Sequence, residues 1–200
     1  MLIQCDAAQL EWRTILQLSQ DEVGIQEVLA KADAHSLNQV AFNLPSRLIA
    51  KIYLFRTIFR GSGWSFANDP DFMHVSSDPK FWDKVNEKFF AKYHGIAACH
   101  ERWKDDVLRQ GRIDGPLGRS WSISLRRHEK TGELKIPWTL LSNYPVQGTG
   151  ADVMMIARIS ADKRLKKYKI PFKWRSTVHD SFKVNIQPIP VLWQVIDYLP

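Results

Sequence analysis

The sequence predicts an α+β fold, because strand-like alternation lies near both ends of the chain and helical spacing fills the region between them. Residues 2–5 alternate apolar and polar side chains, and residues 172–186 do so on both sides of a short turn. The 200 residues are 44% hydrophobic, which is enough to bury a core. We therefore expect a small sheet accompanied by a larger set of helices.

The composition indicates a polyanionic partner. The net charge is +7 with a pI near 9.5, but charge alone does not separate nucleic acid from an anionic membrane surface. Because no apolar run approaches a membrane span and the N-terminus lacks the order of a signal peptide, we expect a soluble protein that is not secreted and has no membrane partner.

Cysteine usage argues against a disulfide scaffold or a zinc ribbon, since Cys5 and Cys99 lie far apart without paired ligands. His94, Cys99 and His100 are close enough in sequence to suggest a metal site. His and Cys on an aromatic-rich helix are more often packed than coordinated, so we do not assign one.

Asp6 follows the first predicted strand and precedes a helical pattern over residues 9–16. A carboxylate just past a strand end can point into a cleft and bind a metal ion. An Asp at this position is also an ordinary helix N-cap, which the residues alone favour.

The helix predicted over residues 47–59 organises the chain. It follows a mixed helical pattern over residues 21–41 and the helix-breaking Pro45. Residues spaced four apart form a slowly winding stripe on one of its faces. The stripe consists of Arg47, Lys51, Phe55 and Phe59. Cations near a helix N-terminus favour phosphate and rings further along suit a base, so the stripe could hold a nucleotide. An amphipathic helix with core phenylalanines and solvated cations has the same pattern, which periodicity alone favours.

The middle of the chain predicts a loop, a long aromatic-rich helix and a ribbon. Residues 64–77 contain turn signals and predict the loop. Helical spacing begins near Phe81 and resumes after Gly95, and we assign its aromatic residues to the core. Residues 119–136 predict a hairpin or ribbon with exposed arginines, which suits phosphate contact as well as a solvated edge strand.

The last part of the chain predicts a helix and a hairpin. Residues 143–150 are interpreted as a polar, glycine-bearing segment that leads into a helix over residues 151–167. The alternation in residues 172–186 places Asp180 at a hairpin tip, where the residues alone favour turn chemistry as its role. Residues 191–199 predict the beginning of a further helix.

Together these segments resemble the three signature motifs of the DNA polymerase I-like family, called family A, in their order and spacing. Residues 6–13 (DAAQLEWR) resemble its first motif, residues 47–55 its nucleotide-binding finger helix, and residues 178–181 (VHDS) its third motif. Further agreement comes from residues 31–35 (KADAH), Gly118-Arg119 and residues 144–152 (YPVQGTGAD).

The resemblance extends over nearly the whole chain and implies a truncated right-hand architecture. It implies a palm, with a small antiparallel sheet and helices, and mostly helical fingers. The implied domains are the first part of the palm with its metal-binding strand (1–21), the fingers (22–130), the second part of the palm (131–187) and the start of a truncated C-terminal palm helix (188–200).

The resemblance also implies template-directed DNA synthesis from dNTPs by a two-metal mechanism, with two Mg²⁺ ions. Asp6 and Asp180 would bridge the metals, with the Ala7 carbonyl as an additional ligand, because hard cations prefer oxygen donors. The catalytic residues would be Asp6, Asp180 and Lys51, and Lys51 would donate a proton to the pyrophosphate.

Further site residues follow from the resemblance. The nucleotide-binding residues would be Arg47, Lys51, Phe55, His35, Glu11 and Gln9. Of these, Arg47, Lys51 and His35 would contact the triphosphate. Phe55 would stack on the base and, with Glu11, exclude a ribose 2′-hydroxyl. The DNA-binding residues would be Phe59, Gln147, His179 and Arg119, and such contacts position DNA without reading its sequence.

Five positions depart from the family pattern without removing a metal ligand. They are Ala8 for Ser, Phe59 for Tyr, Arg56 and Arg60 for Gly, and Ser181 for Glu. We expect the two arginines to alter template contacts or the closing motion. Several bacteriophage members look similar over residues 56–66, so we expect a bacteriophage-type polymerase in the cytoplasm or nucleoid of a bacterial host cell.

We expect the chain to be the C-terminal fragment of a split or truncated polymerase, because the family's thumb and proofreading exonuclease are not in it. The expected partners are primer-template DNA, dNTPs and a separately encoded N-terminal fragment with thumb and exonuclease. One alternative is a non-catalytic remnant that binds nucleic acid or a partner. Another is a two-metal nuclease using Asp6 and Asp180, which leaves the stripe of residues 47–59 unexplained.

Overall fold

The computed structural model describes residues 1–127 and 130–187 of the chain, which divides into two compact units. The first, here called the sheet unit, comprises residues 1–10 and, of the described residues, 150–187. The second, here called the helical unit, comprises residues 11–149. Among the described helices, none is long and apolar enough to cross a membrane.

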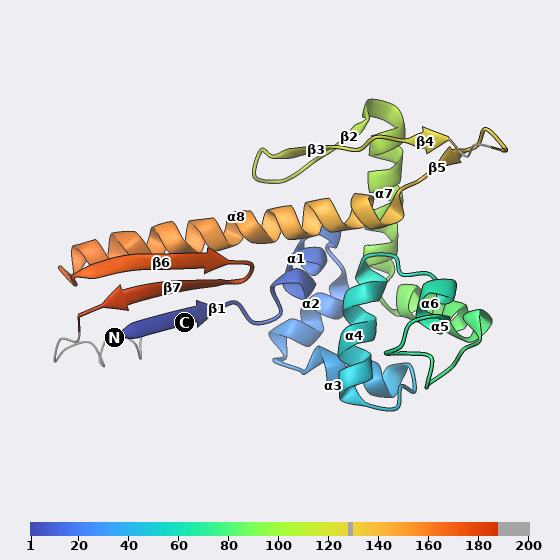
Figure 1. Ribbon diagram of the computed structural model, residues 1–200, viewed down its shortest axis with the longest axis horizontal. Coiled ribbons are helices and arrows are strands. Elements are labelled where there is room, and N and C mark those ends of the chain that lie inside the picture. Colours follow the sequence, from blue (N-terminus) through green and yellow to red (C-terminus); the bar gives the residue numbers. More distant parts are fainter. Residues whose placement is uncertain (128–129, 188–200) are drawn as a thin grey trace. The chain divides into compact units, whose positions relative to one another are not determined.

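The sheet unit is built on three antiparallel strands in the order β1-β7-β6 (Figure 1). The strands are β1 (Leu2–Asp6), β6 (Phe172–Val178) and β7 (Ser181–Ile186). Strands β6 and β7 form a hairpin, and β1 pairs with β7 along its whole length. The structure therefore confirms the predicted N-terminal strand and C-terminal hairpin.

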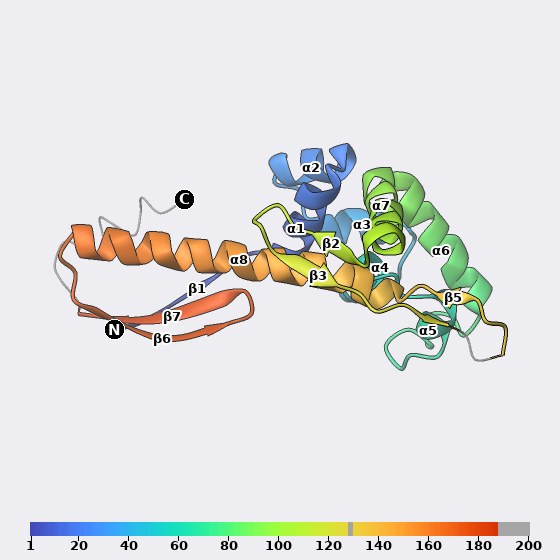
Figure 2. The same ribbon diagram turned by 90° about the horizontal axis from the view of Figure 1, so that it is seen from above.

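Helix α8 (Trp138–Lys167) covers one face of this sheet with its second half (Figure 2). The apolar layer between them contains the buried side chains of Ile170, Val184 and Ile186. Two polar contacts fix the helix on the strand: the Trp174 indole N–H donates to Asp162, and Arg158 donates to Thr177, each at 3.0 Å. The alternate residues of β1, including Asp6, are exposed and do not join this layer.

In its described residues, the helical unit contains seven further helices and two short hairpins. The helices are α1 (Leu10–Ser19), α2 (Glu22–Leu29), α3 (Ala34–Ala41), α4 (Arg47–Ile58), α5 (Gly63–Ala67), α6 (Pro79–Lys92) and α7 (His94–Gln110). The hairpins join β2 (Arg112–Asp114) to β3 (Ser120–Ser122) and β4 (Arg126–Arg127) to β5 (Leu134–Lys135). The hairpins confirm the ribbon predicted over residues 119–136.

An aromatic cluster forms the core of the helical unit. Tyr53 of α4 is fully buried and stacks on Trp82 of α6, with ring centroids 6.0 Å apart and ring planes inclined by 27°. Its hydroxyl donates to the Asn86 side chain, whose amide donates in turn to the Gly61 carbonyl (2.9 and 3.0 Å). The inner face of α4 is thus held by both packing and hydrogen bonds, which confirms that the aromatic residues belong to the core.

Three predicted boundaries were wrong. The expected loop over residues 64–77 contains the short helix α5, which Ser62 caps by accepting from the Ser65 N–H (3.2 Å). The long helix is two helices, α6 and α7, which meet at Tyr93. Residues 143–150 do not lead into a helix but lie inside α8, which begins at Trp138.

Gly148 shows why the start of α8 was misplaced. A β-carbon at this position would lie 2.4 Å from the Trp121 indole, so the glycine permits close packing of the helix on the ribbon. Sequence rules interpret the same glycine as a helix breaker. The helix predicted over residues 191–199 lies outside the described residues, and the palm and finger ranges stay a prediction.

Candidate active site

The two predicted metal-binding carboxylates belong to one end of the three-stranded sheet. Asp6 is the last residue of β1 and pairs in register with Ser181 of β7, the neighbour of Asp180. The backbone N–H of Ala7 donates to the carbonyl of Asp180 at 2.8 Å. Because α1 begins only at Leu10, the interpretation of Asp6 as a helix cap is wrong.

Asp180 occupies a two-residue turn with His179, whose φ is 50° and whose side chain is exposed. Neither the Asp180 nor the Asp6 carboxylate makes a hydrogen bond or ion pair with the part of the chain that the structure describes. The predicted turn chemistry therefore does not engage the Asp180 side chain. Both carboxylates are available to a ligand, and Asp6 is exposed whereas Asp180 is half-buried.

The donor set fits a hard divalent cation. Two carboxylates and the Ala7 carbonyl supply only oxygen, which Mg²⁺ prefers. Within residues 1–127 and 130–187, no group of three or more His, Cys, Asp or Glu side chains is placed to hold a metal. His94, Cys99 and His100 accordingly form no metal centre there, and the last two are buried in the core.

Helix α4 carries the predicted stripe on its outer side. Ser46 caps the helix by accepting from the Ile49 N–H at 3.2 Å. Arg47 and Lys51 are exposed, whereas Phe55 and Phe59 are half-buried against the core. The rings thus take part in packing while each keeps an accessible side, and the helix ends at Ile58, one residue before Phe59.

Arg47 has a partner that the sequence analysis missed. Its guanidinium donates to both carboxylate oxygens of Asp33, at 2.7 and 2.9 Å. Asp33 also caps α3 by accepting from the Ser36 N–H (3.0 Å). The Arg47 hydrogen bond holds the pKa of Asp33 far below its usual value. By contrast, Lys51 makes no hydrogen bond or ion pair with the described residues.

His35 lies under the stripe, within electrostatic reach of Arg47 and Lys51. Only 3% of its surface is exposed, and its ring centroid is 6.0 Å from that of Phe55. Burial lowers the pKa of His35, so the ring is neutral at pH 7. This position suits support of Phe55, and the expected triphosphate contact of His35 stays a prediction.

Four further predicted site residues lie on or beside α8, α1 and the turn between β2 and β3. The Gln147 amide of α8 donates to the Glu11 carboxylate of α1 at 3.3 Å, which brings two of the predicted residues together in the helical unit. Arg119 lies in the turn between β2 and β3, where Gly118 takes a φ of 84°. Gln9 precedes α1 with a φ of 55°.

The whole arrangement of motifs corresponds to one family. The family model described as DNA polymerase family A matches residues 1–191. The chain belongs to DNA polymerase family A. DNA polymerase I of Pseudomonas aeruginosa is 25% identical to it over 195 residues, which are 93% of this chain and 21% of that protein. DNA polymerase I of Aquifex aeolicus is 30% identical over 105 residues, which are 52% of this chain and 16% of that protein. The chain thus spans about a fifth of the length of these relatives.

A solved structure confirms the fold of this family A chain. The POL domain of Pol1 from M. smegmatis, in complex with DNA primer-template and dNTP, matches it with a TM-score of 0.81 at 20% identity. The match covers 98% of this chain and 35% of that chain. The predicted α+β fold with a small antiparallel sheet is therefore confirmed.

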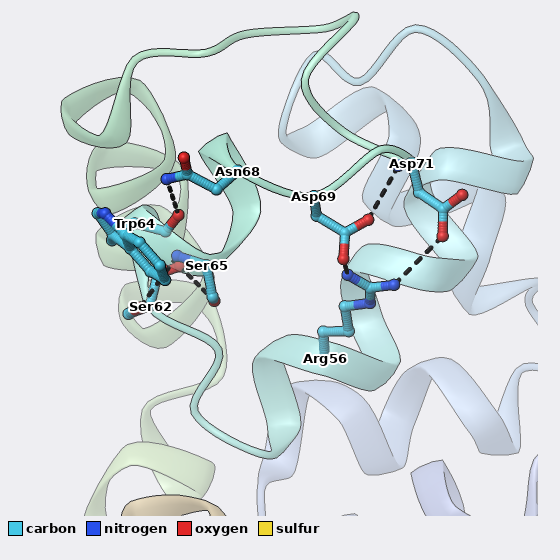
Figure 3. A network of polar contacts seen from close by, with 7 residues as sticks. All are labelled: Arg56, Ser62, Trp64, Ser65, Asn68, Asp69 and Asp71. Atoms are coloured by element: carbon cyan, nitrogen blue, oxygen red, sulfur yellow. Dashed lines mark hydrogen bonds and ion pairs between the residues drawn. The ribbon is translucent and has the colours of Figure 1, made fainter.

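Arg56, one of the two arginines expected to depart from the family pattern, is bound within the helical unit (Figure 3). Its guanidinium pairs with the carboxylates of Asp69 and Asp71 and lies over the Phe72 ring, 5.0 Å from the centroid. The Asp71 N–H donates to Asp69 at 2.9 Å, which orients the acidic pair. Arg56 therefore anchors the segment after α5 to α4, a role that the sequence did not reveal.

Arg60, the second arginine expected to depart from the family pattern, lies just after the end of α4. The Arg60 N–H donates to Thr57 and the Gly61 N–H to Arg56, each at 2.9 Å, while Arg60 itself takes a left-handed φ of 61°. This helix end normally favours glycine, because a side chain there costs about 1 kcal/mol.

Contacts of the Arg60 side chain offset that cost. The guanidinium lies between the rings of Phe90 and Trp138, 4.6 Å from each centroid. It also pairs with Glu101 at 3.1 Å, and its Nε donates to Nδ1 of the buried His100 at 3.0 Å. Arg56 and Arg60 thus attach α4 to neighbouring segments at two points.

His100 should make stability depend on pH. Its Nδ1 accepts from Arg60 and so carries no proton, and burial lowers the pKa of His100 to about 3. Since the unfolded chain takes up a proton below about pH 6.5, we expect the free energy of unfolding to fall by about 2 kcal/mol between pH 7 and pH 5. Urea unfolding at the two pH values measures this loss.

His100→Gln should remove most of that pH dependence, because glutamine takes up no proton on unfolding. His94→Gln, at an exposed position of the same helix, is the matched control and should keep the wild-type slope. An unchanged slope in His100→Gln would show that His100 is not held neutral.

Proposed function

We propose that this chain carries out nucleotidyl transfer from a dNTP to a primer 3′-hydroxyl on a DNA template. The observation that carries the proposal is the meeting of Asp6 and Asp180 at one end of the sheet, in a chain that belongs to family A. The structural relative from M. smegmatis was solved with DNA primer-template and dNTP, which supports the same substrates for this chain.

Asp6, Asp180 and the Ala7 carbonyl would hold divalent cations, with Mg²⁺ fitting their oxygen donors best. Such ions, when bound, supply charge stabilisation at the attacking and leaving oxygens of an in-line displacement. The protein's part is to hold the two carboxylates rigidly. One lies at a strand end and the other in a two-residue turn, and the backbone N–H of Ala7, next to Asp6, donates to the Asp180 carbonyl.

The outer side of α4 would bind the incoming nucleotide. Arg47 and Lys51 lie within the first turns of the helix, where the dipole and exposed N–H groups also favour a triphosphate. Lys51 would donate a proton to the departing pyrophosphate. Phe55 would present its accessible side to the base, with neutral His35 behind it. Glu11, oriented by Gln147, would act with Phe55 to favour deoxyribose.

The chain spans about a fifth of the length of the Pseudomonas aeruginosa relative. We propose, independently of this span, that a separately encoded N-terminal fragment supplies the thumb and exonuclease. That the polymerase is of bacteriophage type stays a prediction. The test is extension of a labelled primer-template with Mg²⁺ and dNTPs, with the purified chain alone and with a co-expressed neighbouring fragment. Extension in either reaction supports the proposal. Folded protein that extends no primer in both reactions rejects it.

The ion pair between Arg47 and Asp33 leads to a specific prediction for dNTP affinity. For Arg47 to bind a phosphate, it has to leave Asp33, so removing the Asp33 charge should favour binding. We expect Asp33→Asn to lower the KM for dNTP about two- to fivefold. Asn keeps the cap of α3, because its carbonyl oxygen can still accept from the Ser36 N–H.

Steady-state primer extension over a range of dNTP concentrations measures this change. Asp78→Asn, which alters an exposed cap of α6 in the same way, is the matched control and should leave KM unchanged. A KM that rises in Asp33→Asn would mean that Asp33 orients Arg47 instead of competing for it.

A further inference from the structure

The net charge of the chain is concentrated in one short segment. Residues 158–175 contain eight Lys or Arg residues and one Asp, a net charge of +7. This equals the charge of the whole chain, so the rest holds 20 basic and 20 acidic residues. The segment forms the end of α8, the turn after it and most of β6, all in the sheet unit.

Three of these cations have partners within the protein. Arg158 donates to Thr177, Lys166 pairs with Asp162, and Arg175 faces the Asn185 amide. The other five are exposed and make no hydrogen bond or ion pair with residues 1–127 or 130–187. We call these five residues the basic end: Lys163, Arg164, Lys167, Lys169 and Lys173. The helix dipole favours cations only in the last turn of a helix, so it does not account for the cations of the basic end outside the last turn of α8.

The basic end is separate from the carboxylate pair. Lys173 pairs across the sheet with Asn185, which pairs with Leu2, whereas Asp6 pairs with Ser181. Leu2 and Asp6 are four residues apart on β1, so Lys173 lies about 13 Å along the strands from the position level with Asp6. Lys173 therefore lies away from the predicted metal site, and the α8 cations of the basic end follow Asp162, which accepts from Trp174, the neighbour of Lys173.

The chemistry of the basic end favours the backbone of duplex DNA. Binding of single strands relies on aromatic stacking platforms, but among these residues only Tyr168 presents an exposed ring, and Lys167 lies over it at 5.7 Å. A membrane-surface helix has apolar and cationic faces along the same length. In α8 the exposed apolar residues precede the five cations of the basic end instead of lying opposite them; they are Leu140, Tyr144, Val153, Met155, Ile156 and Ile159.

We propose that the basic end is a second, sequence-independent contact site for the phosphates of duplex DNA, apart from the predicted contacts at the primer terminus. This proposal rests on the proposed function in one respect: it takes duplex DNA as the polyanion that the chain binds. Each phosphate that a cation neutralises releases counterions, so binding should weaken steeply with salt.

The experiment is fluorescence anisotropy of the full chain with a labelled duplex, between about 50 and 200 mM salt, with EDTA and no dNTP. The test variant is Lys163→Gln, Lys167→Gln and Lys173→Gln together. We expect its slope of log K against log salt to be smaller by about 2 to 3, since each lost contact removes about 0.9. The matched control is Lys80→Gln, Lys84→Gln and Lys88→Gln on α6, which removes the same charge from exposed positions and should keep most of the slope.

Equal slopes in the two triple variants would overturn the proposal. It would also be overturned if the test variant lost binding to phosphatidylserine–phosphatidylcholine vesicles while its duplex binding was unchanged. Because the assay contains neither metal nor dNTP, its result is independent of catalysis. If the chain extends no primer but shows the expected slopes, the DNA contact site is supported and the proposed function is rejected. If the chain extends primers but the two triple variants have equal slopes, the proposed function is supported and the DNA contact site is rejected.

Discussion

Asp180→Asn should reduce primer extension about a thousandfold, equivalent to about 4 kcal/mol of transition-state stabilisation. The carboxylate is half-buried and has no hydrogen-bond partner in the described part of the protein, so its loss should remove a ligand without breaking a structural contact. Single-turnover extension with saturating dNTP and Mg²⁺ measures the rate, and circular dichroism verifies the fold.

Two comparisons make the Asp180 result specific. Asp105→Asn alters an exposed carboxylate on α7 and should extend primers at the wild-type rate. Duplex binding in EDTA should be the same for Asp180→Asn as for the wild type. If Asp180→Asn extended primers normally, the carboxylate pair would not be catalytic. If the variant kept every biological effect of the chain, the non-catalytic binding alternative would be favoured.

Asp21→Ala should destabilise the helical unit strongly, by about 3 to 5 kcal/mol. Asp21 is fully buried, and each of its carboxylate oxygens accepts from the first turn of a different helix. One accepts from the Gly24 N–H of α2 at 2.9 Å, and the other from the Gly95 N–H of α7 at 2.8 Å. Alanine would leave both N–H groups without their carboxylate partner, the Gly24 N–H buried and the Gly95 N–H partly buried. Urea unfolding at pH 7 measures the loss.

Asp21→Asn separates the two hydrogen bonds, because an amide has only one acceptor oxygen. We expect it to lose roughly half as much stability as Asp21→Ala. Asp78→Ala, at the exposed cap of α6, should lose only about 1 kcal/mol. If Asp21→Ala were no more destabilising than Asp78→Ala, the double cap would not be a major support of the unit.

The spacing of apolar residues along the chain was sufficient to predict those strands and helices whose pattern is set by residues close together in sequence. Alternation identified β1 and the hairpin of β6 and β7, because one face of each strand packs on α8 and the other does not. Helical spacing identified α4, whose inner side has to be apolar. The same rules misplaced the start of α8, since Gly148 serves packing on Trp121, which precedes it by 27 residues.

The residue types needed for the proposed chemistry could therefore be identified from the sequence: two carboxylates at strand ends, and cations followed by rings on one helix. What the fold added depends on residues far apart in the chain. Asp6 and Asp180 meet only because β1 pairs with β7. Arg47 is held by Asp33, His35 is buried behind Phe55, and Arg56 and Arg60 are bound by acidic and aromatic side chains of other segments. No pattern of neighbouring residues records such contacts, because packing alone decides which side chains come within bonding distance.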